Sequence, residues 1–185
     1  MRFEFFRASL MRDELRERVR RLRLMIFDVD GVLTDGTLYM GEAGVEMKAF
    51  NVRDGHGIKM LRDSGVVVGI LSARRSRVVD ARAAELGIDL VEQGAADKGA
   101  SFDRLVSRAG FSPPVTGYMG DDVMDLPVFA RCGFAVSVPD APDIVRERAH
   151  HVTRAAGGRG AAREICELIM QTQSTLERSI ARPAG

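Results

Sequence analysis

Short apolar runs alternate along the chain with segments of helical periodicity. The runs are continuously apolar and rich in Val and Ile, which is typical of strands covered on both faces. Between them, apolar residues recur at the spacing of helices that pack one face against a sheet. The alternation predicts an α/β fold, with a central parallel sheet between two layers of helices. We expect strands over 22–29, 66–71, 88–92, 115–120 and 134–138, and helices near 55–64, 75–86, 98–109, 125–132, 142–148 and 160–178.

One segment, residues 36–50, does not follow this alternation. Its pattern of strand, Gly-containing turn and strand predicts a β-hairpin inserted after the first strand. A lone two-stranded hairpin is marginal in water, so we expect this one to pack against another subunit. Its apolar members are Leu38, Met40, Val45, Met47 and Phe50.

The amino-terminal extension, residues 1–21, is predicted to be an amphipathic helix. Leu15 and Val19 lie at helical spacing with Leu22, opposite an Arg/Glu face. We expect neither a signal peptide nor a membrane anchor, because the segment has no long apolar stretch and no small-residue cleavage site.

Composition excludes several function classes. Lys and Arg number 27 against 26 Asp and Glu, so no global field attracts nucleic acid or an anionic membrane. Cys132 and Cys166 have neither metal-ligand spacing nor the density of a disulfide framework. This cysteine usage favours a reducing compartment, and we expect a cytoplasmic protein.

Polar residues gather where the predicted strands end. Asp28 and Asp30 follow the first strand, Ser72 ends the second, Lys98 opens the helix after the third, and Gly120-Asp121-Asp122 follows the fourth. Right-handed crossovers place the carboxyl ends of parallel strands at one edge, where ligands bind. We therefore expect these segments to converge on one crevice.

The segment D-V-D-G-V-L-T at 28–34 carries the strongest chemical signal. Two aspartates directly after a buried strand repel each other, a cost that a metal ion and a phosphoryl-transfer role can offset. The alternative is a turn with Asp caps. Lys98 at a helix start is unfavourable with the helix dipole, which indicates function. Asp122 and Asp125 would also cap the helix entered through Pro127, a role compatible with supporting a site.

The segment DVDGVLT, Ser72, Lys98 and GDDVMD (120–125) resemble the four motifs of the haloacid dehalogenase-like hydrolase superfamily, which has a Rossmann-like three-layer fold. The resemblance implies that Asp28 attacks phosphorus and forms an aspartyl-phosphate. Asp30 would protonate the leaving oxygen and then deprotonate water. Ser72 would donate to a phosphate oxygen, and Lys98 would neutralise developing charge.

The same resemblance implies a Mg²⁺ site, with Mn²⁺ or Co²⁺ as other candidates. Its protein ligands would be the carboxylates of Asp28 and Asp121 and the backbone carbonyl of Asp30. Asp122 and Asp125 would support these ligands without binding the metal ion themselves.

Two further segments narrow the resemblance. F-N-V-R-D-G-H-G-I (50–58) and G-G-R-G-A-A-R-E-I-C-E-L (157–168) resemble the capless 3-deoxy-D-manno-octulosonate 8-phosphate phosphatases, over about 22–170. Between the motifs there is room for the hairpin and single helices, and no cap domain fits. Three departures stand out: Ser72 lies in LSARR where the family more often has Thr-Gly-Arg, His56 fills a usually aromatic position, and the amino-terminal extension does not align.

The family resemblance implies a homotetramer with active sites between subunits, and a mobile tail at 157–160 that closes over a neighbour's site. A flexible linker is the other interpretation of that tail. For Lys59 and Arg82 a solvated helix face remains open. The domains expected are the extension 1–21, a catalytic domain 22–156 with the hairpin at 36–50, and a tail and helix at 157–185. The implied substrate contacts are Asp30, Asn51, Val52, Arg53, Asp54, Gly55, Lys59, Arg74, Arg82, Lys98 and Arg159.

The expected function is therefore a Mg²⁺-dependent phosphatase for 3-deoxy-D-manno-octulosonate 8-phosphate. A related nine-carbon sugar acid 9-phosphate and a broad range of sugar phosphates are alternative substrates. A non-catalytic binding homologue is a further alternative, which the presence of Asp28, Asp30, Lys98 and Asp121 disfavours.

Overall fold

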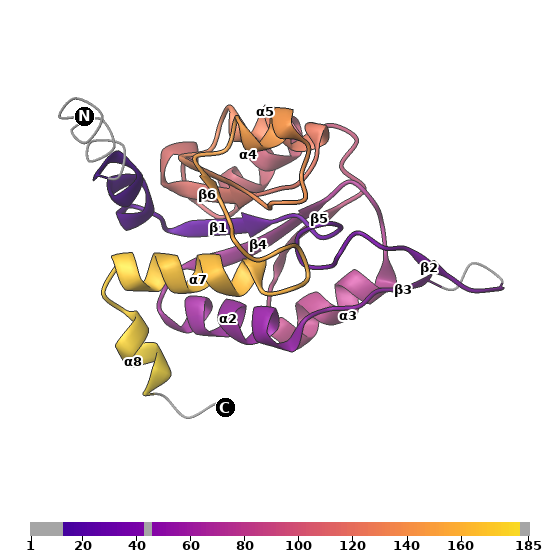
Figure 1. The fold of residues 1–185 in the computed structure, drawn as a ribbon, viewed down its shortest axis with the longest axis horizontal. Coiled ribbons are helices and arrows are strands. Elements are labelled where there is room, and N and C mark those ends of the chain that lie inside the picture. Colours follow the sequence, from indigo (N-terminus) through magenta and orange to yellow (C-terminus); the bar gives the residue numbers. More distant parts are fainter. Residues whose placement is uncertain (1–12, 43–45, 182–185) are drawn as a thin grey trace.

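A computed structural model describes residues 13–42 and 46–181. Its main sheet is parallel, in the order β5-β4-β1-β6-β7-β8 (Figure 1). The α/β prediction is confirmed. The strands are β1 Leu24–Phe27, β4 Val67–Ser72, β5 Leu90–Gln93, β6 Thr116–Met119, β7 Phe134–Ser137 and β8 His151–Val152.

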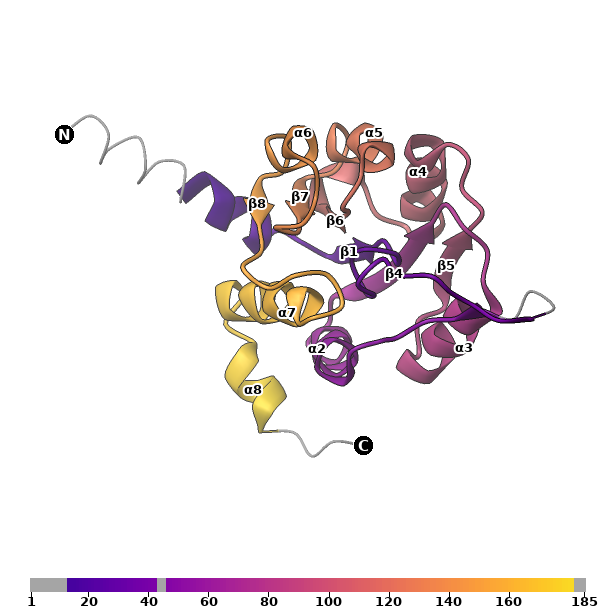
Figure 2. The same ribbon diagram turned by 45° about the vertical axis from the view of Figure 1, so that its right-hand side comes forward.

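Helices cover both faces of this sheet (Figure 2). One layer holds α2 Val52–Asp63, α3 Arg77–Leu86 and α7 Ala161–Thr172, and the other holds α4 Lys98–Arg108, α5 Leu126–Phe129 and α6 Asp143–Arg146. Short 3₁₀ turns, η2 Pro113–Val115 and η3 Val123–Asp125, flank β6. The helices expected at 125–132 and 142–148 are shorter than predicted, since the first turn of the former is 3₁₀ and Pro142 delays the latter.

The core lies between the sheet and these layers. Every residue of β1 is fully buried, as its position at the centre of a sheet covered on both faces requires. Tyr118 on β6 packs edge-to-face against both Phe102 and Phe129, with ring centroids 6.4 and 6.2 Å away. This packing fixes the strand from which the GDDVMD loop departs.

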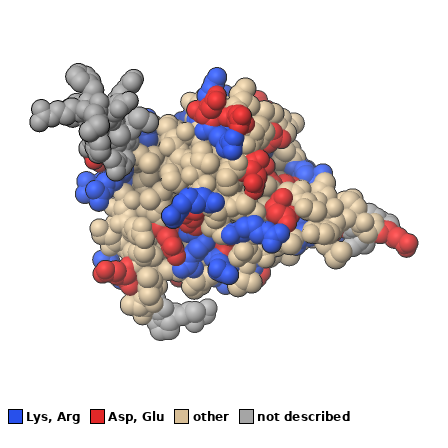
Figure 3. Space-filling view, viewed as in Figure 1, with Lys and Arg blue, Asp and Glu red and all other residues tan. Residues whose placement is uncertain are grey.

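The predicted hairpin is present and extends away from the body of the molecule (Figures 1 and 3). Its strands β2 Tyr39–Met40 and β3 Glu46–Met47 pair antiparallel, while the turn at 43–45, with Val45, lies outside the described residues. Leu38, Tyr39, Met40 and Met47 are 42 to 63% exposed. The surface in Figure 3 is mostly uncharged here, whereas Lys/Arg and Asp/Glu are interspersed over the rest of the view.

The carboxyl-terminal segment differs from the prediction. The helix expected over 160–178 is two helices, α7 and α8 Leu176–Ile180, because the chain turns at Ser174 with φ 57°. Helix α7 packs on α2 and buries Ile165, Cys166 and Ile169 completely. The buried face of α7 is part of the main hydrophobic core.

The described part of the amino-terminal extension agrees with the amphipathic prediction. Residues 13–20 are helical, Leu15 and Val19 pack on the core, and Arg18 donates to the Gly133 carbonyl at 3.0 Å. Residues 1–12 of the extension lie outside the described part. No helix among the described residues is long and apolar enough to span a membrane.

Candidate active site

A pocket of about 240 Å³ opens at the carboxyl ends of β1, β4 and β6. The segments that the sequence placed at this edge do converge. The lining residues are Asp28, Asp30, Gly31, Gly36, Ser72, Ala73, Arg74, Lys98, Asp121, Asp122 and Met124.

Lys98 lies between two buried carboxylates. Its ammonium group donates to Asp28 Oδ2 and, at 2.6 Å, to Asp125 Oδ1. Asp97 caps the helix, accepting from the Ala100 N–H at 2.9 Å, so that Lys98 occupies the first position of α4. The Val29 N–H holds Asp28 Oδ1 at 2.7 Å. A lysine that is 4% exposed is therefore paired on both sides.

Asp125 holds the loop after β6 in place through hydrogen bonds. Its Oδ1 accepts from Lys98 and, at 2.6 Å, from the Tyr118 hydroxyl, while its Oδ2 accepts from the N–H groups of Asp121 and Asp122 at 2.9 and 3.0 Å. Both oxygens thus already have two donors, which leaves little room for a metal ion. The arrangement suits the supporting position that the sequence assigned to this residue.

Gly31 allows the two acidic loops to meet. Its φ is +82°, and a Cβ atom on it would lie 2.0 Å from Asp121 Oδ2. A side chain here would push Asp121 out of the pocket. The glycine of the D-V-D-G segment therefore serves the close approach of Asp121 to Asp28.

The acids outnumber the cation that neutralises them. Carboxylate oxygens of Asp28, Asp121 and Asp125 lie within 4.8 Å of one another. Burial raises the pKa of Asp28 to about 7 against the opposing pull of Lys98, and Asp125 adds to the rise. Burial, Asp28 and Asp125 raise the pKa of Asp121 to about 8. A divalent cation with oxygen preference between Asp28 and Asp121 would compensate this charge, so the residues present fit Mg²⁺.

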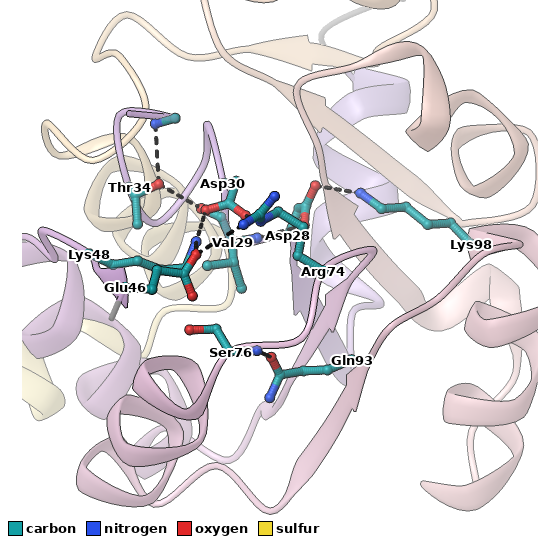
Figure 4. A network of polar contacts seen from close by, with 11 residues as sticks. Asp28, Val29, Asp30, Thr34, Glu46, Lys48, Arg74, Ser76, Gln93 and Lys98 are labelled. Carbon is teal, nitrogen blue, oxygen red and sulfur yellow. Dashed lines mark hydrogen bonds and ion pairs between the residues drawn. The ribbon is translucent and has the colours of Figure 1, made fainter. Parts of the chain in front are cut away.

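Asp30 is bound by a different set of residues (Figure 4). Lys48 contacts its Oδ1, and Arg74 Nε lies 3.7 Å from its Oδ2. Glu46 of the hairpin contacts both cations. Sequence reasoning missed Lys48 and Glu46. Lysine occurs only at 48, 59 and 98 in a chain with 27 basic residues, and the side chains of Lys48 and Lys98 are only 1% and 3% exposed.

The FNVRDG segment contacts the GGRG segment within the same chain. Asp54, 2% exposed, accepts from the N–H groups of Gly160 and Arg163 at 3.1 and 2.8 Å. The Asn51 amide donates to the Gly158 carbonyl at 3.3 Å. Asp54 therefore caps the start of α7, a structural role that its implied place among the substrate contacts did not suggest.

Residues 157–160 are packed within the single chain, and the closure of this tail over a neighbour's site stays a prediction. The Gly158 N–H donates to the Val32 carbonyl at 2.9 Å, and a Cβ on Gly157 would lie 1.8 Å from the Gly31 carbonyl oxygen. Arg159 pairs with Asp35 at 3.2 Å. The segment is packed against the loop that carries Asp28 and Asp30.

The remaining implied substrate contacts do not line the pocket in this chain. Val52, Arg53 and Lys59 are exposed on α2. Arg82 lies over the Phe50 ring, 5.6 Å from its centroid, and donates to the Asn51 carbonyl at 3.5 Å. Their role in substrate binding stays a prediction.

The parallel sheet, the acid cluster at its carboxyl edge and the hairpin in place of a cap define the chain as a haloacid dehalogenase-like hydrolase. Residues 87–165 match the family model described as haloacid dehalogenase-like hydrolase. The 3-deoxy-D-manno-octulosonate 8-phosphate phosphatase KdsC of Yersinia pestis is 46% identical over 165 residues, which cover 89% of this chain and 88% of that protein. The chain belongs to the 3-deoxy-D-manno-octulosonate 8-phosphate phosphatase family.

Solved structures agree with this assignment. The Moraxella catarrhalis phosphatase of the same name, in complex with magnesium, phosphate and KDO, superposes with a TM-score of 0.88 at 38% identity, covering 91% of this chain and 97% of that one. The cobalt-bound Haemophilus influenzae phosphatase gives a TM-score of 0.86 at 40% identity, covering 89% of this chain and 99% of that one.

Proposed function

We propose that this protein hydrolyses 3-deoxy-D-manno-octulosonate 8-phosphate to the sugar acid and inorganic phosphate. The observation that carries the proposal is the complete pocket of Asp28, Asp30, Lys98 and Asp121 in a chain 46% identical to a phosphatase of that name. Phosphoryl transfer depends mainly on positioning and charge compensation, which this pocket provides.

In the proposed mechanism Asp28 is the nucleophile. A carboxylate oxygen of Asp28 bonds to phosphorus as the bond from phosphorus to the sugar oxygen breaks, and Asp30 gives its proton to that oxygen. Asp30, now a carboxylate, takes a proton from the water that attacks the aspartyl-phosphate. This second step releases phosphate and restores both aspartates.

Other residues hold the reacting groups. Lys98 keeps Asp28 in place through the ion pair described above, and Ser72 donates its hydroxyl to a phosphate oxygen. Asp28, Asp121 and the Asp30 backbone carbonyl would hold Mg²⁺, which when bound would compensate the phosphate charge. The magnesium in the Moraxella phosphatase structure and the cobalt in the Haemophilus phosphatase structure support a divalent ion here.

The sugar carboxylate would be bound by Arg74, which lines the pocket and has a 47% exposed side chain. We also place the exposed apolar hairpin residues against other subunits in a homotetramer. Such neighbours could bring Arg53, Lys59 or Arg82 to the pocket, which they do not reach within one chain. Sedimentation of the purified protein tests this assembly. The expected location is the cytoplasm.

A panel of phosphate esters with Mg²⁺ tests the substrate, with phosphate release as the readout. We expect the eight-carbon sugar acid 8-phosphate to have a much higher kcat/KM than hexose phosphates. Equal turnover of many hexose phosphates would contradict the proposal, and preference for the nine-carbon 9-phosphate would reassign it. No release from any ester would indicate a binding homologue.

A further inference from the structure

Asp30 and three charged side chains around it form a closed ring of alternating sign (Figure 4). Lys48 contacts Asp30 Oδ1, and Glu46 Oε1 lies 3.4 Å from Lys48 Nζ. The same Glu46 oxygen lies 3.2 Å from Arg74 NH2, and Arg74 Nε is 3.7 Å from Asp30 Oδ2. The two oxygens of Asp30 are thus held by different cations.

The hairpin delivers two members of this ring. Successive side chains of a strand point to opposite faces, and Lys48 directly follows β3, so we place Glu46 and Lys48 on one face and Met47 on the other. Met47 is 60% exposed, whereas the side chains of Glu46 and Lys48 are 14% and 1% exposed. The face that carries the charges is therefore directed into the protein, toward Asp30.

Lys48 and Arg74 differ in burial and in how readily each can leave Asp30. The Lys48 side chain is almost fully enclosed, and a buried ammonium without its carboxylate partner would have lost its hydration without compensation, which fixes it on Asp30. Arg74 is 47% exposed and lines the pocket, so it can exchange Asp30 Oδ2 for another anion at little cost.

We propose that Lys48 is a positioning residue for Asp30. It holds Oδ1 so that Oδ2 is the oxygen that exchanges a proton with the leaving oxygen, while Glu46 holds Arg74 at the pocket mouth for the substrate's carboxylate. The inference rests on the proposed function, because it assigns Asp30 the acid and base role in that reaction. The competing explanation is that the ring only fastens the hairpin to the domain.

Leaving groups of different basicity separate these explanations. An alkyl phosphate needs a proton on its leaving oxygen, whereas p-nitrophenolate departs without one. In single-turnover experiments with Mg²⁺, Lys48→Met should slow release of a sugar alcohol about tenfold to a hundredfold, part of what a positioned general acid contributes. Release of p-nitrophenolate should fall by no more than about threefold, and KM for the alkyl ester should change little.

Two variants serve as controls. Glu42→Gln removes an exposed charge from the same hairpin and should leave both rates unchanged. Lys48→Arg retains the cation and should restore most of the alkyl rate. If Lys48→Met slows both leaving groups equally, or if Lys48→Arg is as slow as Lys48→Met, the positioning role is wrong. Should Lys48→Met unfold at the assay temperature, Lys48→Gln is measured in its place. The same comparison of the alkyl and p-nitrophenyl leaving groups applies to it.

Glu46→Gln tests the other half of the ring. It should raise KM for a phosphorylated sugar acid by about tenfold, on the scale of a charge-assisted hydrogen bond, and leave KM for a neutral sugar phosphate nearly unchanged. Equal changes for both esters would overturn the role of Glu46. If wild-type protein prefers some other alkyl phosphate, the proposed function fails. The slowing caused by Lys48→Met can still be compared between that alkyl ester and the p-nitrophenyl ester, and this comparison tests the role of Lys48 separately.

Discussion

Burial and Asp125 disfavour the charge of Asp28, whereas Lys98 and the Val29 N–H favour it. Its raised pKa reflects burial first and then the nearby Asp125. A buried nucleophile of this kind costs stability at neutral pH, and the cost is consistent with a functional role for the carboxylate.

Asp28→Asn should therefore remove activity without weakening the fold. We expect phosphate release to fall by more than about a thousandfold, because the amide cannot form the covalent intermediate. The melting temperature in chelator at pH 8 should equal or exceed that of wild type, since one of three crowded charges is gone. Near-normal turnover with Mg²⁺ would contradict the covalent mechanism. Asp103→Asn, an exposed carboxylate on α4, is the matched control for both measurements.

At the scale of elements, the catalytic loop is supported by a contact between distant segments. Gly157 lies where a methyl group would meet the Gly31 carbonyl oxygen, and the segment that contains it is tied to α2 through Asn51 and Asp54. The loop after β1 is thereby packed between the sheet edge and the start of α7.

Gly157→Ala should displace this loop and lower kcat by about tenfold or more, since small misplacements of catalytic groups cost large factors. Gly110→Ala is the comparison, because Gly110 has φ +74° with no atom near its absent Cβ. That variant should lower the melting temperature through backbone strain and leave kcat unchanged. If kcat of Gly157→Ala matches wild type, the contact has no influence on the site.

The sequence predicted the parallel sheet and the residues at its edge because buried strands and strand-end acids leave local patterns. It did not predict the partners of Asp54, Asn51 and Gly158, since hydrogen bonds between segments about a hundred residues apart have no local pattern. Lys48 was missed for a related reason. In a short exposed hairpin a lysine is ordinarily a surface residue, and only the position of Asp30 shows that it is buried.

At the scale of the whole molecule, the acid cluster links stability to pH and to metal. Asp28 and Asp121 have pKa values of about 7 and about 8 in the fold, against a usual 3.8. The folded state thus binds protons that the unfolded chain releases near pH 4. This contribution to stability is fully present below that pH and is lost as pH rises through 7 to 8.

Mg²⁺ should offset this loss, because a cation bound by the ionised carboxylates stabilises the folded state most when both are deprotonated. We expect the melting temperature difference between Mg²⁺ and chelator to be small at pH 5.5 and roughly 5 °C larger at pH 8.5, the shift that about 2 kcal/mol produces in a domain of this size. Asp121→Asn should abolish most of the difference at both pH values. A Mg²⁺ effect of equal size at pH 5.5 and 8.5 would mean that Asp28 and Asp121 are not the groups whose charge the ion compensates.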